Sequence, residues 1–165
     1  MTMTQTLNQA VNKARQMTEH IRSDDIPWLP YGPIPNSEWR VLQVDEEWNI
    51  VVMNYRMGPW VTTPVHGHHC AATAYTLEGE WFYDDYRFEA GDIAFEIGEE
   101  THQPITKDKG ATLLTTLIGG KGNDRLLENH FPDGTTQMLR TRLFKACERL
   151  TPEEFAKLDL ATLFD

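Results

Sequence analysis

Short runs of β-branched and aromatic residues, separated by turn residues, recur through the middle of this chain and limit the folds it can adopt. From Trp39 to about Asn129, runs rich in Val, Ile, Thr, Tyr, Phe and Trp are broken by Gly, Pro, Asp or Asn. The breaks come about every eight to twelve residues, which is typical of an antiparallel sandwich or barrel. We therefore expect an all-β fold. The predicted strands are 39–44, 48–57, 61–68, 71–77, 80–83, 92–95, 103–106, 112–118 and 125–130.

The segments on either side of this region differ from it in composition and in the spacing of their apolar residues. Residues 4–22 are polar with apolar residues at helical spacing, which predicts a modest amphipathic helix, and residues 26–35 contain four prolines, which predicts an extended segment. Near the other end, Thr151-Pro152-Glu153-Glu154 has the pattern of a capping box, so a helix should begin within a residue or two of Thr151. We predict an N-terminal arm over 1–38, a barrel over 39–130 and a C-terminal extension with a helix over 131–165.

Charge and composition exclude several classes of function. The formal net charge is -10 and the basic residues are scattered, so a phosphate backbone would be repelled and we expect no nucleic-acid partner. No apolar run approaches the roughly 20 residues of a membrane span. The N-terminus also lacks the apolar core of a secretory signal. We expect no membrane association, a cytoplasmic location, and reduced thiols at Cys70 and Cys147.

Two histidines in one predicted strand, and a third further along the chain, form a pattern with chemical meaning. His66 and His68 flank Gly67, and because strand side chains alternate between faces, both imidazoles point to the same side. His102 follows a predicted hairpin that returns the chain to the same neighbourhood. Three imidazoles that converge inside a barrel form one face of a coordination sphere, so we predict that they bind one divalent transition metal ion.

Two segments around these histidines resemble the cupin motifs. Residues 64–80 resemble the first motif, H-x-H-x(3,4)-E-x(6)-G, with Gly79 as the closing glycine. Residues 91–102 resemble the second, with the distance from glycine to His102 kept. The resemblance implies a cupin-type antiparallel β-barrel, or jelly roll, with short N- and C-terminal helices. One departure matters: Ala72 stands where many cupins have a glutamate ligand, which makes this a three-histidine variant.

The three-histidine variant is similar to the acetylacetone-cleaving and 2,4'-dihydroxyacetophenone dioxygenases. That resemblance implies a non-haem iron dioxygenase that cleaves a carbon–carbon bond in a β-diketone or a hydroxyaryl ketone. Fe(II) is the expected metal, and Zn or Ni could occupy the site in isolated protein. Two alternatives stay open: a metal-binding sensor cupin without turnover, as in anti-sigma factors, and a zinc-dependent isomerase or hydrolase.

The missing glutamate affects the expected substrate and the search for further site residues. Neutral imidazoles leave the ion with its full charge, which favours an anionic chelating substrate, with dioxygen as the second reactant. Glu96 is the candidate acid or fourth ligand, and Asp84 a weaker one. Trp60, near the expected barrel mouth, is the candidate for contact with substrate. A homodimer is expected, since cupins commonly pair through their outer sheets and the proline-rich arm suits an exchange between protomers.

Overall fold

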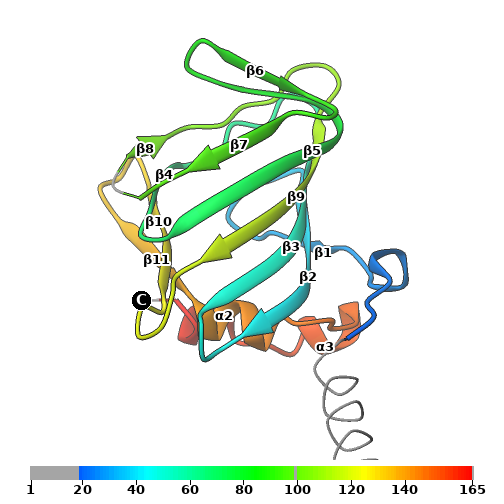
Figure 1. The fold of residues 1–165 in the computed structure, drawn as a ribbon, viewed down its shortest axis with the longest axis vertical. Coiled ribbons are helices and arrows are strands. Elements are labelled where there is room, and N and C mark those ends of the chain that lie inside the picture. Colours follow the sequence, from blue (N-terminus) through cyan, green and yellow to red (C-terminus); the bar gives the residue numbers. More distant parts are fainter. Residues whose placement is uncertain (1–18, 99, 165) are drawn as a thin grey trace, which may run out of the picture.

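The computed structural model describes residues 19–98 and 100–164, and these form a predominantly antiparallel β-structure (Figure 1). The described part of the chain therefore confirms the all-β expectation. The strands are β1 Leu29–Pro30, β2 Ser37–Asp45, β3 Ile50–Met57, β4 Val65–His68, β5 Ala71–Tyr83, β6 Tyr86–Glu89, β7 Ile93–Glu96, β8 Thr101–His102, β9 Ala111–Ile118, β10 Arg125–His130 and β11 Thr136–Arg140.

The strands form two sheets whose inner faces enclose a common core. One sheet has the order β1-β2-β3-β9-β5-β6, with β7 also paired to β5, and the other has the order β11-β10-β4-β8. Isolated bridges join Ile105, which follows β8, to Thr62 before β4 and to Phe82 on β5. No continuous ladder between the two sheets closes a barrel within residues 19–98 and 100–164, so the arrangement is an open jelly roll.

Strand boundaries differ from the predicted ones at a glycine that was taken to end a strand and at a proline that was placed inside one. The runs 71–77 and 80–83 are one strand, β5, because Gly79 lies inside it at φ 74 rather than in a turn. A Cβ at Gly79 would lie 2.1 Å from the carbonyl oxygen of Gly110, so the residue allows a close approach of two backbones. The predicted strand over 103–106 is absent, since pairing ends at His102 two residues before Pro104. Four strands, β1, β6, β8 and β11, were not among the predicted ones.

The helices are short and lie at one end of the sheets (Figure 1). They are α2 Thr141–Ala146 and α3 Pro152–Phe155, together with the 3-10 turns η1 Ser23–Asp25 and η2 Leu160–Thr162. The capping box is confirmed: Glu154 N donates to Thr151 Oγ1 at 3.2 Å, and Thr151 N donates to Glu154 Oε2 at 2.8 Å. The helix predicted over 4–22 lies outside the described residues except for 19–22, which form no helix.

The proline-rich segment lies against the large sheet and contributes to the core. Trp28 lies between the guanidinium groups of Arg40 and Arg56, at 4.5 and 4.3 Å from its ring centroid. Tyr31 is buried and packs on Trp39 with 4.9 Å between ring centroids. This segment therefore closes one side of the space between the sheets. Among the described residues, none of the helices has the length and apolar character needed to cross a membrane.

Candidate metal centre

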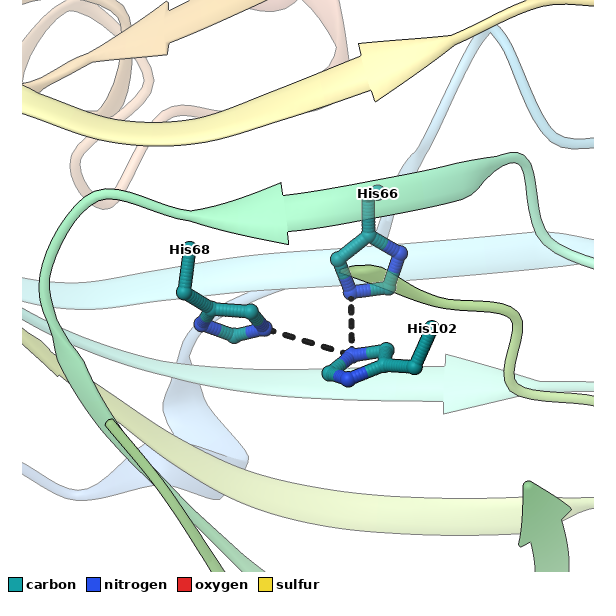
Figure 2. A group of neighbouring side chains, drawn as sticks. All are labelled: His66, His68 and His102. Carbon is teal, nitrogen blue, oxygen red and sulfur yellow. Dashed lines mark hydrogen bonds between the residues drawn. The ribbon is translucent and has the colours of Figure 1, made fainter. Parts of the chain in front are cut away.

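The three predicted histidines meet between the sheets with their side chains directed at one another (Figure 2). His66 and His102 are direct cross-strand partners in β4 and β8, and His68 lies two residues further along β4 on the same face. His102 Nε2 lies 2.9 Å from His66 Nε2 and 3.3 Å from His68 Nε2. One nitrogen from each ring therefore converges on a single point, as the strand alternation predicted.

The spacing of these nitrogens fits a shared metal ion. Two nitrogens about 2.1 Å from one ion, at angles between about 90° and 109°, are about 3.0–3.4 Å apart, close to the observed distances. His66 Nδ1 bonds the carbonyl oxygen of Pro64 at 3.2 Å, which places its proton on Nδ1 and leaves Nε2 with a free lone pair. The three-histidine centre therefore suits a divalent transition metal ion.

Burial keeps the histidines of the centre neutral, the form in which imidazole binds metal. Loss of solvation, and to a smaller extent the charge of neighbouring imidazoles, lowers the pKa of His66 to about 4 and that of His68 to about 3. The pKa of His102 is also lowered, chiefly by burial. Protons therefore compete with a metal for this site only well below neutral pH.

Glu96 places a carboxylate beside the three histidines. It lies on β7 directly across from Ala72 on β5, so the two residues share the inner face. Its Oε2 is 3.3 Å from His68 Nε2 and its Oε1 is 3.4 Å from His102 Nε2, the same spacing that separates the histidine nitrogens. Burial raises the pKa of Glu96 to about 7. A carboxylate therefore faces His68 and His102 from the strand that neighbours β5.

The histidines open into an apolar cavity between the sheets. Its free volume is about 100 Å³. The walls come from both sheets and from the segments at each end of the chain, including Met53, Leu113 and Leu127 with Tyr31 and Phe144. Glu96 is the only carboxylate among the described residues that line it. A ligand at the metal would therefore meet mostly apolar surface beyond the ion.

Three other residues considered from the sequence lie elsewhere. Trp60 is 72% exposed on the connection between β3 and β4, and it does not line the cavity. Asp84 is exposed in the turn between β5 and β6 at φ 49. The Cys70 thiol is buried and donates to the carbonyl oxygen of Leu126 at 3.4 Å, and burial raises its pKa to about 11. None of the three is brought to the histidine centre.

Sequence reasoning missed several residues that shape the site. Tyr83 stacks on His102 with 5.0 Å between ring centroids and an interplanar angle of 19°. The Pro64 carbonyl orients His66, and Tyr31 and Phe144 close the cavity from segments assigned to the arm and the extension. Two of these had a signal: Tyr31 stands in the proline-rich segment, and Tyr83 stands at the turn of the β5–β6 hairpin that precedes His102 along the chain. Phe144 had none, because a helix of six residues leaves little periodicity.

The chain was compared with known proteins at the level of sequence and of structure. Residues 16–119, more than half of the chain, match the model of the ChrR cupin-like domain family. No curated protein sequence matches.

Solved structures with the same fold come from several bacteria. A cupin-like protein of unknown function from Ralstonia eutropha has a TM-score of 0.64 and 23% identity, covering 76% of this chain and 79% of its own. A putative acetylacetone dioxygenase from Methylibium petroleiphilum has a TM-score of 0.61 and 15% identity, covering 72% and 84%. The anti-sigma protein ChrR, solved with SigE from Rhodobacter sphaeroides, has a TM-score of 0.50 and 23% identity, covering 58% and 50%. At these identities the likeness concerns the fold.

Proposed function

Because the chain belongs to the family of ChrR cupin-like domains and carries a three-histidine centre, we propose that it is a metal-dependent dioxygenase acting on a β-diketone. The enzyme cleaves a carbon–carbon bond in a short aliphatic β-diketone. His66, His68 and His102 would hold Fe(II). When bound, the ion would accept the substrate as an anionic chelating ligand and bring it into reaction with dioxygen.

The observation that supports this proposal best is that the histidine centre faces an apolar cavity. A centre with a purely structural role needs no space beside its ion, whereas a reaction with a small organic molecule does. The cavity has few polar groups beyond the centre, which suits a substrate with two oxygens at one end and an alkyl body. Two solved structures of the same fold bear the description acetylacetone dioxygenase, one of them termed putative, which is consistent with this substrate class.

The size of the cavity favours an aliphatic substrate over a hydroxyaryl ketone. Its free volume of about 100 Å³ is smaller than the roughly 150 Å³ of an apolar protein cavity that binds benzene. A hydroxyaryl ketone exceeds benzene by the whole of its side chain and hydroxyl groups. Of the two substrate classes expected from the sequence, the short β-diketone is therefore the proposed one.

Glu96 has two roles that its position supports. A carboxylate 3.3–3.4 Å from two ligand nitrogens can occupy a further ligand position. With a pKa of about 7 it can also accept the proton that a β-diketone loses on binding as an enolate. The apolar walls exclude water and strengthen both interactions.

Oxygen uptake by metal-reconstituted protein tests the proposed function. Protein freed of metal and reloaded with Fe(II) should consume one dioxygen per short β-diketone, and much less with a hydroxyaryl ketone. His66→Ala should abolish uptake and bound iron, while His69→Ala, a neighbouring histidine that bonds Glu128 outside the centre, should change neither. Tight iron binding without uptake for any β-diketone would reject the proposal.

A metal-binding sensor cupin is the second candidate, and the family match itself favours it. The chain spans half of the length of the ChrR chain solved with SigE. Metal binding with no oxygen uptake, together with a metal-dependent interaction with another protein, would support the sensor. The Fe(II) oxygen-uptake experiment separates the two candidates.

A further inference from the structure

A row of polar side chains crosses the inner face of the four-stranded sheet and begins at the metal centre. Strand pairing aligns one residue from each strand of this sheet: His102 on β8, His66 on β4, Asn129 on β10 and Gln137 on β11. Directly paired residues of an antiparallel sheet share a face, so the whole row lies on the side that holds the histidines. Asn129 is therefore the neighbour of His66 on the side away from His102.

The side chain of Asn129 has an unused oxygen at the cavity wall. The residue is 4% exposed and lines the apolar cavity. Both hydrogens of its amide are used, because Nδ2 donates to Tyr31 Oη and to Gln137 Oε1, each at 3.3 Å. Its Oδ1 accepts no hydrogen bond from the described part of the chain, and neighbouring atoms do not fully enclose this oxygen. A hydrogen-bond acceptor is therefore open to the cavity beside His66.

Other polar groups of the cavity wall already have partners. Tyr55 Oη donates to Ser37 Oγ at 3.3 Å, and Thr63 Oγ1 donates to the carbonyl oxygen of Pro104 at 2.9 Å. A buried amide oxygen left without a donor destabilises the state that contains it. A ligand that brings an N–H or O–H group to Asn129 would remove this cost, whereas an alkyl group would not.

We propose that Asn129 determines substrate specificity by accepting a hydrogen bond from the substrate, which is a short 1,3-dicarbonyl compound with an N–H or O–H group at one end. The inference rests on the proposed function, since the two carbonyl oxygens of this compound would bind the metal ion. Paired Cβ atoms lie about 4.5–5.5 Å apart, so the amide of Asn129 lies alongside the imidazole of His66, within reach of a group next to the chelating oxygens. A site that hydrogen-bonds a substrate group discriminates against the analogue that lacks it.

Calorimetric titration of Zn(II)-loaded protein with two compounds of similar size tests the role of Asn129. Acetylacetone ends in a methyl group, whereas acetoacetamide has an NH2 group in its place and can donate to Oδ1. Zn(II) does not react with dioxygen, so binding is measured apart from turnover. The ratio of the two dissociation constants is compared between proteins, because the difference between the compounds as chelators then cancels. In Asn129→Leu this ratio should shift about tenfold against acetoacetamide, the effect of one lost hydrogen bond in a buried site.

Two further variants make the result specific. Thr115→Val is the matched control, because it removes a hydroxyl group from the cavity wall on β9, in the other sheet, and should leave the ratio unchanged. Asn129→Asp keeps an oxygen acceptor in nearly the same shape, so it should retain the wild-type preference even if Asn129→Leu does not fold. Circular dichroism establishes which variants are folded.

The outcomes separate this inference from the proposed function. Binding of both compounds with an unchanged ratio in folded Asn129→Leu, or a preference lost in Asn129→Asp, would overturn the role of Asn129 and leave the dioxygenase proposal in place. Zn(II)-loaded wild type that binds neither compound would overturn both.

Discussion

Ala72 and Glu96 lie opposite each other on neighbouring strands, so a carboxylate faces the histidine centre although alanine occupies the position of the usual glutamate. From the sequence, Ala72 indicates a centre of three neutral ligands. In the structure the inner face has one carboxylate after all, from β7 instead of β5. A carboxylate in either strand reaches the same histidines, because directly paired residues of an antiparallel sheet have their Cβ atoms about 4.5–5.5 Å apart.

Moving the carboxylate from β7 to β5 should therefore preserve the metal site. We expect Glu96→Ala to weaken metal binding about 10- to 100-fold, the range found when groups that support metal ligands are removed. Adding Ala72→Glu to that variant should restore most of the loss. The measurement is competition with a chelator of known affinity, followed by metal analysis.

The single variant Ala72→Glu is the control for this exchange. With Glu96 present, two buried carboxylates would face each other, so one of them should take up a proton near neutral pH and affinity should gain little. An Ala72→Glu/Glu96→Ala protein that binds metal no better than Glu96→Ala would show that Glu96 does not act on the ion.

At the scale of single elements, the capping box of α3 gives a prediction that is independent of the metal. Thr151→Ala removes the oxygen that accepts from Glu154 N, at a cost of roughly 1 kcal/mol in the free energy of unfolding. Thr151→Ser keeps that oxygen and should stay near wild type. The measurement is the urea midpoint of each protein at constant m-value, and an unchanged midpoint for Thr151→Ala would mean that α3 adds nothing to the cooperative fold.

Elements with a strong local signal were predictable from sequence, and those defined by tertiary contacts were not. The strand over 125–130 and the helix at Thr151 have clear turn or capping residues at their boundaries, and both were found. The hairpin strand β6 has only four residues, and β11 is held by its pairing with β10, so neither has enough periodicity to detect.

The candidate site also contains residues that could be predicted from local sequence and residues that could not. His66 and His68 follow from strand alternation alone, and His102 from the motif spacing. Glu96 was a candidate only through its closeness in sequence to His102, because its partner Ala72 is set by the register of β5 and β7. Trp60 was selected for closeness in sequence to the first motif, but the connection from β3 to β4 places it on the surface.

At the scale of the whole molecule, the buried centre couples folding to pH. The pKa values of His66 and His68 are lowered from 6.5 to about 4 and about 3, so below pH 6.5 the unfolded state binds protons that the native state does not. Stability of metal-free protein then rises with pH in this range. Glu96 has the opposite sign: its pKa is raised from 4.5 to about 7, so the native state holds the extra proton between these values.

The two histidines together change the unfolding free energy with pH more than the single carboxyl group does, and this determines the expected pH profile. Between pH 5 and 6.5 the unfolding free energy of metal-free protein should rise by about 1.4 kcal/mol per pH unit for each net proton, and the rise should end near pH 6.5. Carboxyl groups whose pKa values are lowered, such as Glu80 and Glu128, change charge below this window and contribute little within it.

The measurement is urea unfolding at pH 5, 5.5, 6, 6.5 and 7 in a chelating buffer. Saturating metal should raise stability at every pH, because the ion binds the native site in preference to the unfolded chain. The control is His66→Gln/His68→Gln, which lacks both titrating rings and should lose the rise below pH 6.5. A wild-type profile that is flat or falls with pH over this range would mean that the histidines are accessible to protons in the folded protein, contrary to a closed apolar centre.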